Sequence, residues 1–350
     1  MSLPEKEDAN ILHLDPKSRV VVLGASGWIG ANLVRFLVSS TRCAVECWVR
    51  REAAAASLRR ILDDESRLTV RCSDNFADLE VPPDTRVVVH GASPTDHWDV
   101  PGSIATNVSL TWRLLDELSG RRVPVRFVYL STLLVRGDSP APFSERDFDA
   151  GQSFLTPYAQ AKFLAESMIR TTYTNSVEAI ILRLGSVLWS RQGSELPHGN
   201  WLCQSARLWH RGALPIIPLF AEQRFHPIPV DELCALIWYL IVSPSVPRVV
   251  HLPYDAGPTL TSVFELLARK TGLPIPRFCA SDSDQWTEFL ASLPPSVMKR
   301  RIAALFPVPP KGAKLSPVDS EQSREWIERG GFKCAPLPEA YWTHILATSS

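Results

Sequence analysis

The chain has 350 residues, and its 37 basic and 37 acidic side chains give a formal net charge of zero. A balanced charge produces no long-range field that attracts nucleic acid or an anionic membrane, so we expect neither as a partner. With 45% hydrophobic and 21% charged residues the composition is that of an ordinary soluble globule, and the length allows one large α/β domain with or without a smaller lobe.

Three further features of the chain favour a cytoplasmic protein. Residues 1–17 are polar and mixed in charge, without the apolar centre of a secretory signal. The most apolar run, 233–242, is too short to span a bilayer and is expected to form a buried helix. The seven cysteines are scattered without a C-x-x-C pair, so we expect reduced thiols and no metal site.

Apolar strands alternate with helical periods through the first half of the chain. The expected strands are 19–23, 44–49, 68–72, 86–90, 126–130 and 178–184. The expected helices are 28–38, 53–62, 104–118 and 157–172. This alternation of helices with strands that are hydrophobic on both faces predicts an α/β fold with a Rossmann-type, doubly wound parallel sheet.

Beyond residue 187 the alternation gives way to short helices and proline-rich segments. We therefore expect a flexible lead-in at 1–18, a cofactor-binding Rossmann domain at 19–190 and a smaller, mostly helical substrate lobe at 191–350. Part of this lobe, a helix from Val230 and a strand at 249–252, is expected to pack back on the sheet.

The first strand ends in a glycine-rich turn that precedes a helix. Backbone N–H groups and the helix dipole at such a turn point toward an anion, and the missing side chains let a pyrophosphate come close. An ordinary strand-to-helix turn is the alternative. The residues expected to contact a dinucleotide here are Gly24, Ser26, Gly27, Trp28, Ile29 and Gly30.

Tyr158 and Lys162 lie four residues apart on one face of the expected helix 157–172. An ammonium near a phenol favours the phenolate and lowers the phenol pKa, so Tyr158 can act as acid or base near neutrality. Ser131 and Thr132 lie at the C-terminal end of the fifth strand, the sheet edge where ligands bind, and a hydroxyl there can hydrogen-bond the same substrate oxygen. A solvated tyrosine–lysine pair on a surface helix is the alternative reading.

The chain resembles the extended short-chain dehydrogenases/reductases of the NAD-dependent epimerase/dehydratase superfamily, over residues 19 to about 190. The motifs that carry the resemblance are Gly24/Gly27/Gly30, His90-Gly91-Ala92, Asn107-Val108, Thr132, Tyr158/Lys162 and Leu182-Arg183-Leu184-Gly185. The resemblance implies that Thr132, Tyr158, Lys162 and Asn107 are catalytic. It also implies that the cofactor contacts Asp74, Ala92, Tyr158, Lys162 and Gly185.

The choice of Thr132 over Ser131 rests on the family spacing, because the catalytic hydroxyl lies three residues before the valine that Val135 matches. Two positions depart from the family pattern. Leu184 stands where many relatives have proline, and Ser73 replaces the usual glycine before Asp74.

Arg50 and Arg51 follow the second strand. An acid at this position binds the ribose hydroxyls of NAD, whereas a guanidinium accommodates the 2′-phosphate of NADP. The arginines therefore favour NADPH (NADP⁺) as the cofactor. Alternatively, both arginines are merely solvated and Glu46 or Glu52 binds the ribose.

Within the family the chain is most similar to thioester reductase domains of nonribosomal peptide, polyketide and carboxylic acid reductase systems. The similar segments are 45–51, Ala56, Arg59-Arg60, 129–132, 158–166, 228–233 and Trp286. This resemblance implies that NADPH reduces a thioester on an acyl or peptidyl carrier protein to an aldehyde, with a second hydride giving an alcohol. Tyr158 is the implied proton donor. No carrier domain is recognisable, so we expect the substrate in trans, unless the chain is one domain of a larger synthase.

Other functions stay open. One is an NAD(P)H-dependent reductase of a small-molecule ketone or aldehyde, and another is a nucleotide-sugar epimerase. Dehydration is disfavoured because Leu133-Leu134 stand where sugar dehydratases have acids, and a non-redox cyclase or a non-catalytic NADPH sensor is disfavoured by the Tyr158/Lys162 pair. His97, Trp98 and His226 are candidate substrate contacts, with a packing role as the alternative for each.

Overall fold

The computed structural model describes residues 18–61, 66–76, 78–94, 96–139, 141–172, 176–191, 200–219, 226–252, 257–280, 283–306, 317–332 and 336–347. The expected lead-in lies outside this part of the chain except for Ser18, as does Leu62 of the second expected helix. The described residues form two compact units. The sheet unit comprises those of Met1–Thr132, Gln160–Arg183 and Cys234–Val250, and the helical unit those of Leu133–Ala159, Leu184–Leu233 and His251–Ser350.

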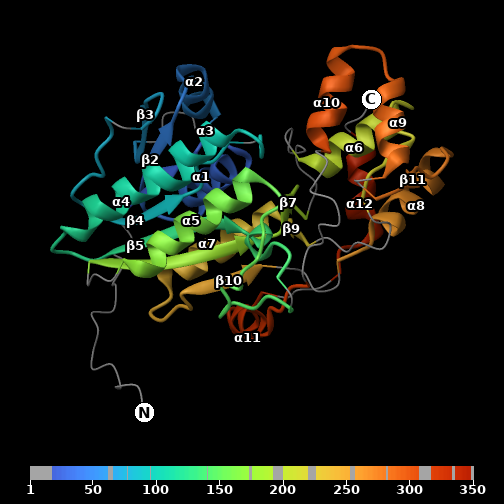
Figure 1. Ribbon diagram of the computed structural model, residues 1–350. Helices are drawn as coiled ribbons and strands as arrows, with labels where there is room; N and C mark the ends of the chain where they lie inside the picture. The colour runs from blue at the N-terminus through green and yellow to red at the C-terminus, as the bar shows by residue number, and fades with distance from the viewer. Residues whose placement is uncertain are drawn as a thin grey trace. The chain divides into compact units, whose positions relative to one another are not determined.

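A seven-stranded sheet organises the sheet unit (Figure 1). Its strands are β1 (Arg19–Leu23), β2 (Ala44–Val49), β3 (Leu68–Cys72), β4 (Thr85–His90), β5 (Val125–Thr132), β6 (Val177–Leu184) and β10 (Val249–Leu252). The strand order is β10-β6-β5-β4-β1-β2-β3, and β1 pairs in parallel with both β2 and β4. The order reverses at β1, which is the point where open α/β sheets bind ligands at the carboxyl ends of their strands. The predicted Rossmann-type sheet is confirmed.

Helices alternate with these strands. They are α1 (Trp28–Ser40), α2 (Glu52–Ile61), α3 (Val100–Ser103), a π-helix (Ile104–Ser109), α4 (Leu110–Ser119), α5 (Pro157–Thr171) and α7 (Val230–Val242). Most of these elements begin or end within two residues of the predicted limits, because buried strands and amphipathic helices have different hydrophobic periods.

The predicted helix 104–118 differs from the observed one in two ways. The helix begins four residues earlier, because the Asp99 carboxylate accepts the Gly102 N–H at 2.9 Å and caps the first turn. The residues that follow form a π-helix, whose end is marked by the Leu110 N–H bonding to the Ala105 oxygen five residues back. A helix does cover the predicted residues, but its π-helical turn was not predicted, because a hydrophobic period does not reveal one widened turn.

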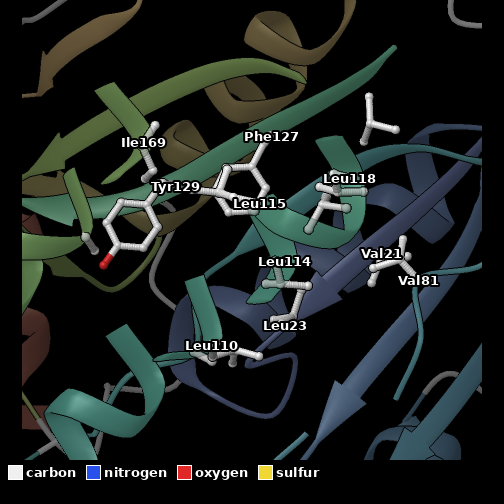
Figure 2. Packing of buried hydrophobic residues seen from close by; sticks show 14 of the residues in the cluster. Val21, Leu23, Val81, Leu110, Leu114, Leu115, Leu118, Phe127, Tyr129 and Ile169 are labelled. Atoms are coloured by element: carbon white, nitrogen blue, oxygen red, sulfur yellow. The ribbon is translucent and has the colours of Figure 1, made fainter. Parts of the chain in front are cut away.

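A hydrophobic core of the sheet unit lies where α4 and α5 pack on the sheet (Figure 2). The leucines of α4 recur at helical spacing and contact strand side chains that alternate along β1 and β5. The core residues shown in Figure 2 include Val21, Leu23, Leu110, Leu114, Leu115, Leu118, Phe127, Tyr129 and Ile169. This packing fixes α5 against β5, the two elements that carry Lys162 and Thr132.

Arg126 of β5 is fully buried. Its side chain points to the opposite face of the sheet from that of Phe127, which belongs to this core. Its Nη1 donates to the carbonyl oxygens of Leu240, Ile241 and Ser243 at 2.8, 2.6 and 2.8 Å. The last carbonyls of a helix lack partners within the helix, so this guanidinium satisfies the end of α7. Glu178 balances its charge at 2.7 Å.

The helical unit contains short helices and two small sheets. Its helices are the 3₁₀ turn Leu133–Arg136, α6 (Trp201–His210), α8 (Leu260–Thr271), α9 (Asp284–Ser292), α10 (Val297–Leu305), α11 (Glu321–Arg329) and α12 (Glu339–Ala347). Its strands are β7 (Ser186–Leu188), β8 (Ile216–Ile217), β9 (Pro227–Pro229) and β11 (Arg277–Phe278). Side chains of Asn200, Thr259, Ser283 and Ser296 cap the first turns of α6, α8, α9 and α10.

Within this unit, α6, α8, α9, α10 and α12 group together (Figure 1). Trp189, which follows β7, holds α12 by a reciprocal pair of hydrogen bonds. Its indole N–H donates to the Tyr341 carbonyl at 3.1 Å, and the Tyr341 hydroxyl donates to the Trp189 carbonyl at 2.9 Å. Across the described helices of the whole chain, none combines the length and apolar character needed to cross a membrane.

Candidate active site

The glycine-rich turn joins β1 to α1 and lies very close to the backbone that follows β4. Gly24 has φ +77°, and a Cβ there would lie 2.8 Å from the Ala92 nitrogen and 2.9 Å from the Gly91 carbonyl carbon. A Cβ on Gly30 would collide with the Gly24 carbonyl oxygen. Glycine is therefore required at both positions, because only a bare backbone lets α1 start against β1 and the end of β4.

The first turn of α1 presents its backbone N–H groups without help from side chains. Gly27 occupies the N-cap with no side-chain cap bond, and the first turn contains no acidic residue. Ser26 and Gly27 are exposed, whereas Trp28 and Ile29 are half-buried. An uncapped helix N-terminus carries a partial positive charge, so this cradle fits the pyrophosphate of a dinucleotide.

Glu46, one alternative ribose ligand, is engaged elsewhere. It lies inside β2 with 1% of its surface exposed. Its carboxylate accepts the Trp48 indole N–H and the Arg71 Nε, each at 2.9 Å, and also pairs with Arg19 at 3.3 Å. These three donors hold the carboxylate within the sheet, so Glu46 is a structural acid and the alternative role for it is disfavoured.

The exposed end of β2 carries mostly positive charge. Arg50 and Arg51 are both exposed, and Glu52, the other alternative ribose ligand, pairs with Arg59 at 2.7 Å. The neighbouring β3 is followed by Asp74, which is also exposed. This part of the edge fits a ligand that carries a phosphate near its adenosine ribose.

The turn after β3 shows what replaces the family glycine. The Ser73 hydroxyl donates to the Asp78 carboxylate and accepts the Phe76 N–H at 3.0 Å. Phe76 has φ 63° and its ring stacks on Trp48 with centroids 6.5 Å apart. Ser73 thus builds a hydrogen-bonded turn that presents Asp74.

Lys162 reaches from α5 to the carboxyl end of β5. Its side chain is almost fully buried, its ammonium donates to the Leu130 carbonyl at 2.6 Å, and it lies 4.5 Å from the centre of the Tyr129 ring. Burial lowers the pKa of Lys162 to about 7, with the Glu166 carboxylate opposing the shift. The lysine therefore changes charge near neutral pH.

A buried ion pair lies beside this lysine. Arg183 of β6 donates to Glu166 of α5 through Nη2 at 2.8 Å and Nε at 3.1 Å. The Ser131 hydroxyl donates to the same carboxylate at 2.5 Å. Ser131 is therefore bound to Glu166, which supports the choice of its neighbour Thr132 as the catalytic hydroxyl.

Asn107 lies in the π-helix and is fully buried. Its Oδ1 accepts the Tyr129 hydroxyl at 3.5 Å, and its Nδ2 has no hydrogen-bond partner among the described residues. Because the Tyr129 ring also contacts the Lys162 ammonium, Tyr129 connects two of the residues predicted to be catalytic. A widened helical turn at such a residue is common at functional sites.

His90, at the end of β4, packs edge-on against the Tyr129 ring with centroids 5.3 Å apart. Burial lowers the pKa of His90 to about 3, and the nearby Lys162 ammonium adds to the shift. The imidazole is therefore neutral and supports the Tyr129 ring by packing.

The remaining predicted residues lie in other places. Tyr158 is half-buried in the first turn of α5, one turn before Lys162, and Thr132 is the last residue of β5. His97 and Trp98 are exposed in the segment before α3. His226 lies beside Gly185, where any Cβ would collide with the His226 backbone.

Sequence reasoning included Tyr129, Glu166 and Arg183 in its motifs but gave them no role, and it did not consider Arg136. Their roles depend on partners far away in the chain, although a tyrosine and an arginine inside apolar strands are a weak signal of buried polar contacts. Among the described residues, no group of three or more histidine, cysteine or acidic side chains could hold a metal ion.

The sequence matches known proteins over most of its length. The profile of the NAD dependent epimerase/dehydratase family matches residues 20–248. The chain is 26% identical over 266 residues to a dTDP-6-deoxy-L-talose 4-dehydrogenase (NAD(P)(+)) of Kitasatospora kifunensis, covering 73% of this chain and 80% of that protein. It is 26% identical over 295 residues to an isonitrile lipopeptide synthase of Streptomyces coeruleorubidus, covering 74% of this chain but only 19% of the synthase.

Solved structures share the fold. The terminal R domain from the myxalamid PKS-NRPS biosynthetic pathway superposes with a TM-score of 0.78 at 21% identity, over 95% of this chain and 90% of that domain. The UDP-glucuronic acid 4-epimerase from Bacillus cereus superposes with a TM-score of 0.60 at 17% identity, over 82% and 98% of the two chains.

Proposed function

The chain belongs to the NAD dependent epimerase/dehydratase family, as its motifs predicted, and we propose that it is an NADPH-dependent reductase of acyl thioesters held by a carrier protein. Membership makes it an extended short-chain dehydrogenase/reductase that uses a nicotinamide cofactor. The observation that carries the redox proposal is Lys162, buried at the carboxyl end of β5 one helical turn from Tyr158.

The residues that would hold the cofactor are distributed along the sheet edge. The glycine turn and the first turn of α1 would bind the pyrophosphate, and Arg50 with Arg51 would bind the 2′-phosphate. Asp74 would meet the adenine, while Ala92 and Gly185 would allow close approach near the nicotinamide end. Lys162 and Tyr158 would bind the nicotinamide ribose, and the nicotinamide supplies a hydride when bound.

The protein's own part in the reaction is to hold an oxygen and deliver a proton. Thr132 and Tyr158 would bind the thioester carbonyl oxygen, and the Tyr158 phenol would donate its proton as negative charge develops there. Lys162 in its charged form would lower the Tyr158 pKa. Asn107 would fix Lys162 through Tyr129. Hydride and proton together give a hemithioacetal, which collapses to an aldehyde and the carrier thiol, and a second round gives an alcohol.

The thioester assignment has its own support. The R-domain structure covers nearly the whole chain at a higher TM-score than the epimerase structure, and the lipopeptide synthase aligns over 74% of this chain. The chain spans about a fifth of that synthase, so a carrier-bound substrate is a proposal for this chain and not a property of the match.

A reductase or dehydrogenase of a small-molecule carbonyl is the second candidate. It is favoured by the talose dehydrogenase, which matches along 80% of its own length. Purified protein should be offered NADPH with acyl-pantetheine thioesters, ketones, aldehydes and dTDP-sugars in parallel. Oxidation of NADPH only with sugars or ketones contradicts the thioester proposal.

Replacing the proton donor tests the chemistry itself. We expect Tyr158→Phe to lower kcat by about 10² to 10⁴ because a positioned general acid contributes that much. NADPH affinity, measured by fluorescence titration, should change little. Tyr239→Phe, a substitution within α7, serves as the control and should keep full activity. Near-normal turnover in Tyr158→Phe would remove that residue from the mechanism.

A further inference from the structure

Arg136 is a buried cation that the proposed mechanism does not use. It ends the 3₁₀ turn that follows β5 directly, and only 8% of its side chain is exposed. Its Nε is fully buried and has no hydrogen-bond partner in the described part of the chain. Burial is the influence that lowers the pKa of Arg136, to about 10, so no nearby carboxylate compensates its charge.

Two other buried arginines show how this protein normally treats such a charge. Arg183 makes a two-pronged contact with Glu166, and Arg126 bonds three carbonyls and Glu178. A charge taken out of water is costly unless a partner replaces the lost hydration. Arg136 departs from this pattern, which indicates a side chain kept for a partner that is not part of the described chain.

The backbone on both sides of Arg136 is fixed. The Gln152 amide donates to the Val135 carbonyl at 2.9 Å. Gly137 has φ +50°, and a Cβ there would collide with the Ser153 carbonyl oxygen. These contacts hold the backbone that carries the buried Arg136 side chain.

His226 is close enough to Arg136 for the guanidinium to influence its titration. Burial first, and then the Arg136 charge, lower the pKa of His226 to about 4, so its imidazole is neutral at physiological pH. A neutral imidazole adds no second charge beside the guanidinium. The Ser186 N–H donates to the His226 carbonyl at 2.7 Å, which fixes the backbone at this position.

Chain continuity places Arg136 close to Thr132, the last residue of β5. A 3₁₀ turn rises about 2 Å per residue, so Arg136 starts within about 8 Å of Thr132 along the turn. Ligands of parallel sheets occupy the space beyond the carboxyl ends of the strands. A planar guanidinium pairs in bidentate fashion with carboxylate or phosphate, and a short 3₁₀ turn brings such a pair close to the substrate.

We propose that Arg136 binds an oxyanion of the substrate, either a carboxylate on the acyl chain or the phosphate of a pantetheine arm. This inference rests on the proposed function, because it names a recognised group of the same thioester substrate. It makes the enzyme selective for acyl groups or carriers that bring a negative charge to this position.

The test uses three non-reducible amide analogues and the full-length protein without NADPH. Hexanoyl pantetheine amide is neutral, hexanoyl phosphopantetheine amide carries the phosphate, and adipoyl pantetheine amide carries a terminal carboxylate. Affinities are measured by calorimetry for the unaltered protein, Arg136→Met and Arg136→Lys. Arg211→Met removes an exposed arginine of the same unit and is the matched control.

We expect Arg136→Met to weaken the analogue with the recognised anion by about 10- to 100-fold, the usual loss of a charged hydrogen bond. The neutral analogue should bind as before, Arg136→Lys should keep part of the affinity, and Arg211→Met should change nothing. Loss with the adipoyl analogue alone identifies an acyl carboxylate, and loss with the phosphate analogue alone identifies the pantetheine arm.

Equal affinities in Arg136→Met and the unaltered protein for all three analogues overturn the proposal, as does an equal loss with the neutral one. The melting temperature of Arg136→Met tests separately whether Arg136 has a structural role. It should stay the same or rise, because an apolar side chain replaces an unpaired buried charge. A clear fall would mean that Arg136 is a structural ion-pair residue, and would also overturn the proposal.

The two proposals fail separately. Analogue binding that depends on Arg136, in a protein that reduces no thioester, contradicts the reductase function and leaves the anion site in place. Reduction of all thioesters, with kcat and KM unaffected by Arg136→Met, contradicts the anion site alone.

Discussion

Three buried charges of the sheet unit and one buried charge of the helical unit differ in their partners. In the sheet unit Glu166, Arg183 and Arg126 are almost fully buried, and each has a partner of opposite charge. In the helical unit Arg136 is similarly buried, and among the described residues its Nε has no partner. Paired charges hold strands and helices together. A buried charge without a partner, such as Arg136, can still bind an anionic ligand, as we propose.

In the proposed mechanism, this contrast separates the residues that perform the reaction from the residue that recognises the substrate. Lys162 lies beside paired side chains, because a proton donor and its neighbours must be held in one place. Substrate recognition would instead use a buried cation whose partner is the substrate itself.

The largest stability effect should come from breaking a paired charge of the sheet unit. Glu166→Gln leaves the Arg183 guanidinium buried without its anion, and we expect a loss of about 3–5 kcal/mol in the free energy of unfolding. Urea unfolding followed by circular dichroism measures it. Arg136→Met is the matched comparison and should lose nothing. Equal losses of unfolding free energy in the two variants would contradict the proposed difference between the paired charge and Arg136.

A double variant sharpens the same point. Glu166→Gln combined with Arg183→Met removes both buried charges, and we expect it to be more stable than Glu166→Gln alone. A double variant less stable than both single variants would show that packing around the pair, and not its charge balance, holds α5 to β6.

Exposed cations of the sheet unit should act on the cofactor alone. Replacing both Arg50 and Arg51 by alanine should weaken NADPH binding by about 10- to 100-fold, because charged contacts to phosphate are lost. NADH binding and the melting temperature should hardly change. Fluorescence titration with both cofactors measures the ratio of the NADPH and NADH dissociation constants. Arg42, exposed just before β2, provides the control alanine variant. An equal loss for NADH would argue against recognition of the 2′-phosphate.

The smallest effect concerns the titration of Lys162. Its folded-state pKa of about 7 lies below its ordinary value of 10.5, so between these limits the unfolded chain holds the additional proton. Without cofactor, stability should therefore rise with pH in this window, by at most about 1.4 kcal/mol per pH unit.

The measurement compares the free energy of unfolding at pH 7 and pH 9 in the unaltered protein and in Lys162→Met. The variant should lose the Lys162 part of the rise, while Lys270→Met, at an exposed lysine, should keep it. A rise that is identical in Lys162→Met would show that other groups produce it.

Much of the sheet was predictable from the sequence, because its strands are apolar on both faces and the helices between them repeat every three to four residues. The same logic placed Lys162 and Tyr158 one turn apart on a helix. The π-helix at 104–109 was not predictable, since the side-chain pattern of a widened turn resembles that of an ordinary one.

The pairing of buried charges was equally hidden. Glu46 was a candidate ribose ligand from its position in the chain, and only the fold shows that Arg19, Arg71 and Trp48 surround its carboxylate. Glu166 of α5 and Arg183 of β6 lie 17 residues apart in the chain, and their side chains meet only in the folded protein. Such partners depend on three-dimensional register, which a single sequence does not contain. The roles of Thr132, Tyr158 and the other site residues stay predictions.

The chain passes between the two units five times, after residues 132, 159, 183, 233 and 250. Four of these crossings fall inside α5, β6, α7 and β10, so the units share single helices and strands. A recombinant hybrid that takes its helical unit from a relative would need every one of these elements cut and rejoined. For protein engineering, point substitution at residues such as Arg136, the proposed anion site, is therefore a simpler way to alter substrate preference than exchange of the whole helical unit.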